Sequence, residues 1–285
     1  MNIESECITC IFNQALRVSK VLDLDQKRTK DILDIAASHV PKFSYSKTPP
    51  QNATPMYEDI ARYLKVEDIY KEIKRSSNLH AKKLKSRSVE ILEKSSDKFK
   101  TALKIAVVGN VIDLASEVIF DLESEVENVI NSNFMIDDST LLKESLKRSK
   151  SIVYLADNVG ENIFDAIFIR YLKESFDLNV YYFVRSKPII NDISFSDLDL
   201  LGDLNEFVTI VDSGVKTPGI VYNDLNKEAK SIFDSADTII SKGMGNYECL
   251  NQMSSFNIFF LLKVKCSVVA RSLNRKIGDI ICKRV

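Results

Sequence analysis

The sequence predicts an α/β protein, with a helical N-terminal domain followed by a Rossmann-like, three-layer α/β/α domain that is built on a mainly parallel sheet. The first of the eight glycines is Gly109, and a stretch without glycine has few tight turns, so residues 1–108 should be mostly helical. After about Lys150, short apolar runs alternate with helical spacing, which is typical of a parallel sheet covered by helices on both faces. We place the helical domain at residues 1–100, extending at most to 150, and the α/β/α domain at residues 101–285.

Helical periodicity marks three segments of the N-terminal part. One apolar face is formed by Cys7, Ile8, Ile11, Phe12, Ala15 and Leu16. Residues 25–40 predict a second helix that ends before Pro41. Residues 78–98 predict a further helix that is rich in Lys and Arg, and a solvated face explains these charges better than a phosphate-binding patch does.

Proline and glycine set the expected ends of the helices. Four of the six prolines lie between Pro41 and Pro55, which predicts a loop there. Thr54 followed by Pro55 is typical of an N-cap with proline in the first turn, so a helix should begin at this point. Gly109 should end the helix that contains the apolar residues 99–107, and helical structure should continue to about Lys150.

The strand candidates are short apolar runs with β-branched and aromatic residues. They cover residues 152–156, 180–184, 207–211, 238–240, 258–263 and 279–283. The first of them is followed at once by Asp157 and Asn158, then by Gly160, and the amphipathic spacing of a helix begins near Ile163.

Composition narrows the class of protein. The 285 residues carry a net charge of −1, which gives no general attraction to nucleic acid or to an anionic membrane. Apolar runs long enough to span a membrane and the features of a signal peptide are both missing from the sequence. Five cysteines, an odd number, argue against a disulfide scaffold, so we expect a cytoplasmic protein. The sequence does not indicate an oligomeric state.

Polar residues follow several of the expected elements at the point where each ends. Asp157 and Asn158 follow residues 152–156, and Asp192 lies shortly after residues 180–184. Lys242, Gly243, Gly245 and Asn246 follow residues 238–240, and Asn110 lies at the expected end of a helix. Because parallel strands direct their carboxyl ends to one edge of the sheet, we expect the first three groups to converge there.

Two carboxylates and an amide oxygen are hard ligands, so Asp157, Asn158 and Asp192 suit a divalent metal ion that keeps water or substrate in its other positions. A phosphate group beside that ion would need Lys242, Arg185 and the N–H groups of the Gly243–Gly245 turn and of the helix that starts at Asn158. This set of residues suits metal-assisted phosphoryl chemistry.

Structural explanations exist for each of these residues. Asn158 with Glu161 resembles a capping box, Asp192 has the position of a helix cap, and the glycines fit a simple turn. P-loop, G-x-G-x-x-G and G-x-S-x-G motifs are missing, and both histidines lie in the helical part, so catalysis would use carboxylates, amides, lysine and metal. Cys7 and Cys10 most simply pack as small apolar residues, but a redox or metal role with Cys249 or Cys266 stays open.

The same residues resemble the metal-dependent damage-control phosphatases, first described as domain of unknown function 89. The resemblance spans nearly the whole chain and rests on five short motifs in order: Cys7-x-x-Cys10 with Gln14, Gly109-Asn110-x-x-Asp113, Asp157-Asn158-x-Gly160-Glu161, Asn191-Asp192, and Lys242-Gly243-x-Gly245-Asn246-x-Glu248. The first motif and the compact length resemble the stand-alone archaeal and bacterial branch.

The resemblance implies a helical domain on an α/β/α domain, metal ligands at Asp157, Asn158 and Asp192, and phosphate contacts at Asn110 and Lys242. It implies hydrolysis of small phosphate esters, such as sugar phosphates or damaged cofactor intermediates, with manganese, cobalt, nickel or magnesium. On this basis we take Asp157, Asn158, Asp192 and Lys242 as catalytic, and Asn110, Arg185, Gly243, Gly245, Asn246 and Glu161 as substrate-binding. A carboxyl methyltransferase that uses S-adenosylmethionine and a non-catalytic sugar-phosphate or nucleotide sensor stay as alternatives.

Overall fold

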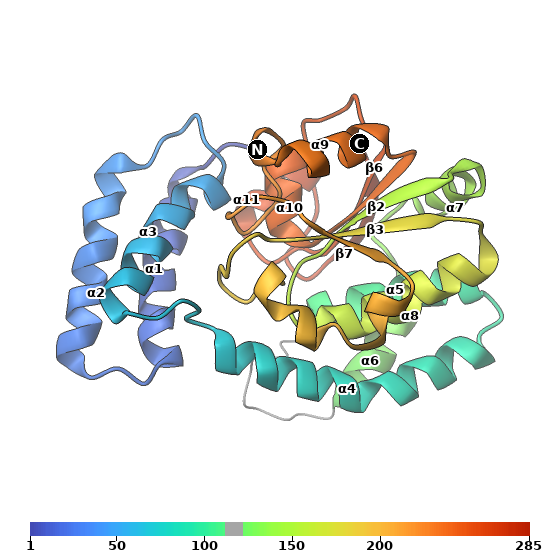
Figure 1. Ribbon diagram of the computed structural model, residues 1–285, viewed down its shortest axis with the longest axis horizontal. Helices are drawn as coiled ribbons and strands as arrows, with labels where there is room; N and C mark the ends of the chain where they lie inside the picture. The colour runs from blue at the N-terminus through green and yellow to red at the C-terminus, as the bar shows by residue number, and fades with distance from the viewer. Residues whose placement is uncertain (112–121) are drawn as a thin grey trace.

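The computed structural model describes residues 1–111 and 122–285, and it begins with a unit of three helices. These are α1 (Ser5–Val21), α2 (Gln26–His39), which continues into the short 3-10 helix η1 (Val40–Lys42), and α3 (Pro49–Leu64). Figure 1 shows them in blue, beside the rest of the molecule. Their buried side chains, including Ile11, Ile32 and Ile60, form one core that also contains Ile189 and Val268.

The expected start of a helix at Thr54 and Pro55 is wrong, because α3 begins one and a half turns earlier. The Thr48 hydroxyl accepts a hydrogen bond from the Gln51 N–H, and the Gln51 side chain accepts one from the Thr48 N–H, which forms a capping box. Pro49 and Pro50 then occupy the first turn, where the missing N–H has no helical partner in any case. Pro55 lies inside the helix and costs it a single backbone hydrogen bond.

Four helices come next: α4 (Lys71–Lys94), α5 (Lys98–Val111), α6 (Leu122–Asn131) and α7 (Ser139–Arg148). Of these, α5 and α7 contact the sheet, α4 and α6 pack on α5, and both α4 and α5 contact α8 (Glu161–Ser175). The helix predicted over residues 78–98 corresponds to α4, which begins earlier, at Lys71, and ends at Lys94, while Lys98 begins α5. Ala81 and Leu84 of α4 lie in a different core from the side chains of α1 to α3, and the expected domain boundary near residue 100 stays a prediction. Asp113 lies outside the described residues.

Gly109 does not end a helix, contrary to the expectation, since α5 continues to Val111. A Cβ atom on Gly109 would lie 2.8 Å from Cγ of Glu161. The glycine is therefore required by the close approach of α5 to the start of α8, and it brings Asn110 next to Glu161.

In the described residues, seven strands form one sheet in the order β1-β7-β6-β5-β2-β3-β4. Their bounds are β1 (Ile136–Asp137), β2 (Ser151–Leu155), β3 (Asn179–Val184), β4 (Thr209–Asp212), β5 (Thr238–Lys242), β6 (Ile258–Lys263) and β7 (Ile280–Arg284). The pairing is parallel except between β6 and β7. All six expected strands are confirmed, whereas the two-residue strand β1 was expected to be helical.

Helices cover both faces of the sheet, which confirms the predicted α/β/α architecture. Ile152 and Tyr154 of β2 point into the core under α5 and α8, and Val153 and Leu155 point into the opposite core. That second core is covered by α9 (Lys227–Ser235), α10 (Gly243–Leu250) and α11 (Ser267–Leu273). In Figure 1 the sheet lies between these two layers. The 3-10 helices η2 (Phe195–Leu200), η3 (Gly202–Glu206) and η4 (Tyr222–Asp224) lie in the connections on either side of β4.

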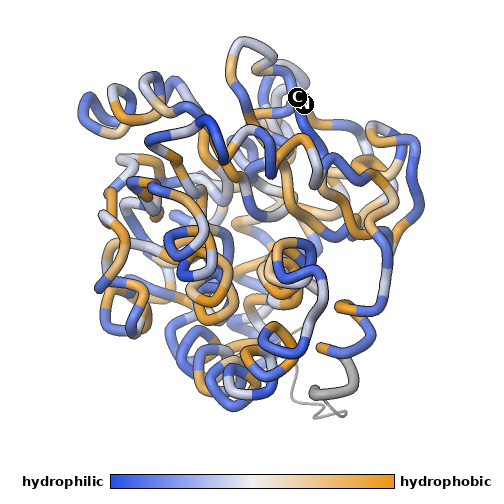
Figure 2. Tube along the Cα trace, turned by 90° about the vertical axis from the view of Figure 1, so that its right-hand side faces the viewer, coloured by the Kyte–Doolittle hydropathy of each residue, from blue (hydrophilic) through white to orange (hydrophobic). Residues whose placement is uncertain are grey.

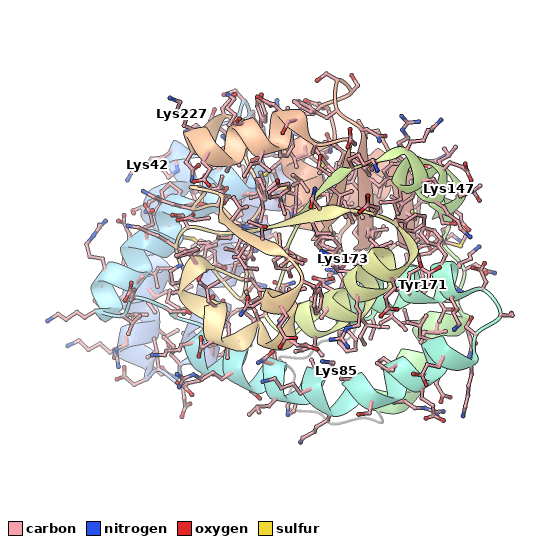
Figure 3. All side chains as sticks on the ribbon, turned by 45° about the vertical axis from the view of Figure 1, so that its right-hand side comes forward. Lys42, Lys85, Lys147, Tyr171, Lys173 and Lys227 are labelled. Carbon is pink, nitrogen blue, oxygen red and sulfur yellow. The ribbon has the colours of Figure 1, made fainter. Side chains whose placement is uncertain are left out.

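Hydrophobic and hydrophilic residues alternate along the helices in Figure 2, as expected for helices that bury one face. Figure 3 shows charged side chains over the surface, with Lys42 near the N-terminal helices and Lys147 toward the opposite end of the molecule. None of the helices in the described residues has the length and hydrophobicity needed to cross a membrane.

Candidate active site

The candidate site lies at the carboxyl ends of the neighbouring strands β5, β2 and β3. Asp157 follows β2 by two residues, Arg185 follows β3 directly, and Lys242 is the last residue of β5. The loop after β3 turns back on itself, so that Ile193 N–H donates to the Asp157 carbonyl and Val159 N–H donates to the Asn191 carbonyl, each at 2.9 Å. These bonds place Asp192 opposite Asn158.

Two amides and two carboxylates form a closed hydrogen-bonded square at the centre of the site. The Asn110 amide nitrogen donates to Asp157 Oδ2 at 2.9 Å and to Glu161 Oε1 at 3.1 Å. The Asn158 amide nitrogen donates to the same two oxygens, at 3.0 and 2.9 Å. Asn110 is fixed from the other side because its Oδ1 accepts a hydrogen bond from the Lys263 N–H at 2.9 Å.

Lys242 is fully buried and does not line the cavity. Its ammonium donates to Glu161 Oε2 at 3.0 Å and to Asp165 Oδ1 at 2.8 Å. The direct phosphate contact that we expected from Lys242 therefore stays a prediction, and within the described part of the chain its ammonium donates to two carboxylates.

Arg185 is also buried, and its guanidinium donates from Nε to Asp192 Oδ2 at 2.9 Å and from Nη2 to Asn246 Oδ1 at 3.1 Å. Its Nη1 has no hydrogen-bond partner within the described part of the chain. Asn246, expected on the substrate side, instead bonds backbone atoms: its amide nitrogen donates to the carbonyls of Ala156 and Lys242.

Gly243 and Gly245 lie in the first turn of α10, not in a loop as expected. Gly243 has a φ of +77°, and a Cβ atom there would lie 1.9 Å from Asp157 Oδ2. A Cβ atom on Gly245 would lie 2.1 Å from the Pro218 carbonyl oxygen. Both positions need glycine because Asp157 and Pro218 lie too close for a Cβ atom. Of the two glycines, only Gly245 lines the cavity.

A cavity of about 360 Å³ opens beside the square of amides and carboxylates. Four of the predicted side chains line it: Asn110, Asp157, Asn158 and Asp192. The opposite wall comes from α1 and α3, with Glu6, Cys7, Cys10, Ile11, Gln14 and Pro50 among its residues. The site is therefore formed between the helical unit and the sheet.

Lys265, Glu248 and Cys266 complete the cavity, and the sequence reasoning did not assign them to the site. Lys265 follows β6 by two residues, so the rule that selected Asp157 and Asp192 applies to it equally. Glu248 was visible only as part of a resemblance motif. Cys7 is buried in the helical core as expected, whereas Cys10 is exposed at the cavity, and the five cysteines are all free thiols.

Charge at the site is dominated by carboxylates. Burial and the charges of Glu161 and Asp192 raise the pKa of Asp157 well above its ordinary value. Burial raises the pKa of Asp192 to about 6, against the lowering effect of Arg185 and Lys74. Burial also acts to raise the pKa of Glu161, but Lys242 and Lys265 outweigh it, so that this pKa is lowered. A cation beside Asp157 and Asp192 would offset the cost of ionising both.

The residues present fit a divalent ion by their chemistry. In the described residues, Oδ1 of Asp157, Oδ1 of Asp192 and Oδ1 of Asn158 accept no hydrogen bond, and all three side chains line the cavity. Three His, Cys, Asp or Glu side chains that could share one ion are not found in residues 1–111 and 122–285. The proposed set has only two such side chains, and its third member is an amide.

The fold and the site define a class of protein: a three-layer α/β/α protein with a carboxylate-rich cavity at the carboxyl edge of parallel strands. Residues 3–281 match the damage-control phosphatase ARMT1-like domain, so the chain belongs to this family, as the sequence motifs predicted. Membership supports a phosphatase activity for the chain.

Relatives of this chain extend over its full length. It is similar to a damage-control phosphatase of Pyrococcus horikoshii, with 35% identity over 100% of this chain and 98% of the relative. It is also similar to a damage-control phosphatase of Archaeoglobus fulgidus, with 31% identity over 100% of both chains. The crystal structure of a DUF89 family protein from Pyrococcus horikoshii has the same fold, with a TM-score of 0.90 and 35% identity, and covers 100% of this chain and 99% of that one.

Proposed function

We propose that this protein is a metal-dependent phosphohydrolase that removes phosphate from small phosphorylated metabolites, such as sugar phosphates or damaged cofactor intermediates. The observation that carries the proposal is the pair of buried carboxylates, Asp157 and Asp192, that face one cavity, each with an oxygen that has no hydrogen-bond partner among residues 1–111 and 122–285. A cavity of about 360 Å³ suits a small metabolite and not a macromolecule. The five free cysteines agree with a cytoplasmic protein.

Asp157, Asp192 and the amide oxygen of Asn158 would hold the ion, which can be manganese, cobalt, nickel or magnesium. When bound, a divalent ion supplies Lewis-acid polarisation of the phosphate and acidifies water.

Lys265 is the residue we propose for the phosphate oxygens. It is exposed and lines the cavity. Its positive charge acts to lower the pKa of Asp157, against the larger effect of burial, and helps to lower the pKa of Glu161. Its charge would stabilise the negative charge that develops during phosphoryl transfer. Its backbone lies next to the Met244 side chain of α10, because the Lys265 N–H donates to Met244 Sδ at 3.2 Å.

The test is a screen of phosphorylated metabolites for phosphate release, with manganese, cobalt, nickel or magnesium added to chelator-treated protein. We expect hydrolysis that depends on the ion, and loss of ion binding in calorimetry for Asp192→Asn. Full activity of a verified metal-free preparation would refute the metal assignment. Methyl transfer from labelled S-adenosylmethionine without phosphate release would refute the phosphatase, and ligand binding without turnover would show a sensor.

A further inference from the structure

A chain of buried polar side chains runs from the middle of the sheet to the candidate site. Asp165 of α8 is fully buried and accepts hydrogen bonds from the hydroxyls of Tyr154, at 2.5 Å, and Tyr182, at 2.9 Å. The two tyrosines are register partners on β2 and β3, and their rings stack with centroids 5.5 Å apart. Their hydroxyl groups hold the Asp165 carboxylate from the side of the sheet.

Lys242 connects Asp165 to Glu161, because its ammonium donates to both carboxylates. Both oxygens of Glu161 are therefore engaged: Oε2 accepts from Lys242, and Oε1 accepts from the amides of Asn110 and Asn158. Lys242 thus fixes the Glu161 carboxylate in the position where it meets the two amides.

The position of Glu161 decides which atom Asn158 presents to the cavity. The Asn158 nitrogen gives hydrogen bonds to Asp157 and Glu161, which leaves its oxygen as the free end of a side chain that lines the cavity. Turning the amide over would place this oxygen against two carboxylate oxygens and leave them without donors.

Stability alone does not explain these buried groups. Replacing a buried ion pair by well-packed apolar side chains is often neutral or stabilising, since desolvation of the charges is costly. Here the Asp165 carboxylate, the phenols of Tyr154 and Tyr182 and the Lys242 ammonium occupy a core region under α8 that apolar side chains such as Phe, Leu or Met would fill. Unlike apolar side chains, these polar groups form a series of hydrogen bonds with fixed donors and acceptors, and the series ends at Glu161.

We propose that Asp165 is a positioning residue: held by Tyr154 and Tyr182, it anchors Lys242, which holds Glu161 so that the Asn158 oxygen faces the cavity. That this orientation helps to hold an ion rests on the proposed function. The orientation of the Asn158 amide is independent of the proposed function, and it can be tested without metal or substrate.

The test measures the side-chain amides by NMR in protein labelled with 15N-asparagine, with the signals assigned from their loss in Asn110→Ser and Asn158→Ser. In Asp165→Asn, one amide oxygen replaces two carboxylate oxygens. At least one of the three donors, Tyr154, Tyr182 and Lys242, therefore loses its hydrogen bond to residue 165. We expect the Asn158 NH2 signals to shift and their solvent exchange to rise by about tenfold or more, the factor for loss of one buried charged hydrogen bond. Unchanged Asn158 signals would overturn the proposal.

Asp203→Asn is the matched control. It also removes a carboxylate that pairs with a lysine, because Asp203 Oδ2 accepts from Lys85 at 2.8 Å, but it lies outside the chain of contacts described above. The Asn158 signals should not change in this variant. If they change equally in both variants, general loosening explains the effect and the positioning role is refuted.

If Asp165→Asn does not fold, Tyr182→Phe replaces it. This variant keeps the Lys242 contact and removes one of the donors to Asp165, so a smaller shift of the Asn158 signals is expected, and no shift would refute the role. With substrate, a positioning role lowers kcat per folded molecule and weakens Mn²⁺ binding in calorimetry, whereas a purely structural role lowers only the unfolding midpoint. A wild-type protein that neither binds Mn²⁺ nor hydrolyses phosphate esters refutes the proposed function, and the NMR result still decides the positioning role.

Discussion

The Cα of Gly243 approaches the carboxylate of Asp157 so closely that a Cβ atom would lie 1.9 Å from Oδ2. The first residue of α10 and the segment that follows β2 are therefore in direct contact across the site. Because Asp157 Oδ2 also accepts hydrogen bonds from Asn110 and Asn158, any displacement of this carboxylate breaks the central square of amides and carboxylates.

Gly243→Ala should abolish ion binding, because the methyl group displaces the Asp157 carboxylate. Gly202→Ala is the matched control: its φ is also positive, at +63°, but a Cβ atom there meets nothing within 4 Å. Both variants should lose about 1–2 kcal/mol of unfolding free energy from backbone strain, and only Gly243→Ala should lose Mn²⁺ binding in calorimetry. Normal binding by Gly243→Ala would contradict the described contact.

Lys265→Ala should lower kcat/KM for a phosphate ester by about a hundredfold while the unfolding free energy stays within about 0.5 kcal/mol of the wild type, since Lys265 is exposed. Lys227→Ala, which removes an exposed lysine of α9 (Figure 3), should change neither quantity. Steady-state kinetics and urea unfolding check both. Wild-type kinetics for Lys265→Ala would remove this residue from the phosphate side of the site.

Lys242→Met, unlike Lys265→Ala, should chiefly lower the free energy of unfolding. It leaves Glu161 and Asp165 buried without their shared cation, and breaking a buried pair from one side costs about 3–5 kcal/mol. Urea unfolding measures the loss. A variant as stable as the wild type, with kcat/KM reduced by orders of magnitude, would instead favour the direct phosphate contact that the sequence predicted.

Asp192 should make the metal-free protein less stable as pH rises from about 4 to about 6. Burial raises the pKa of Asp192 to about 6, so the folded state keeps this proton over a range in which the unfolded state, with its ordinary pKa near 4, has released it. The folded state then binds more protons, and the unfolding free energy falls with pH by up to about 3 kcal/mol from this group. Urea unfolding across this range should give a flatter profile for Asp192→Asn. Parallel profiles would show that Asp192 does not titrate in this way.

Cys7→Ala should lower the unfolding free energy by about 1 kcal/mol, because Cys7 is buried among the side chains of the helical unit. Cys10→Ala should change it by less than about 0.5 kcal/mol, since Cys10 is exposed. Elemental analysis should find the same metal content in both variants as in the wild type. Loss of a stoichiometric metal ion in either variant would show that the thiols bind metal and do not only pack.

Local pattern was enough for much of the fold. Six strands could be predicted because each is a short apolar run that its neighbours in sequence delimit, and the rule that parallel strands end at one edge selected Asp157, Asn158 and Asp192. Proline and glycine were less informative. Pro55 and Gly109 look like helix boundaries in sequence, but both lie inside helices, where the surrounding packing outweighs their local preference.

The sequence by itself determined the α/β/α class and the residues at the strand ends, since both follow from the spacing of apolar and polar residues along the chain. Only the tertiary structure decided which cation faces the cavity. Lys242 ends β5 and Lys265 follows β6, yet Lys242 points under α8 to Asp165 and Glu161 while Lys265 lines the cavity. The tertiary structure also placed the far wall, from α1 and α3, although Cys7, Cys10 and Gln14 already belonged to a resemblance motif. Such choices depend on contacts between distant segments of the chain, 77 and 81 residues apart for the two carboxylates that bind Lys242, which no local spacing records.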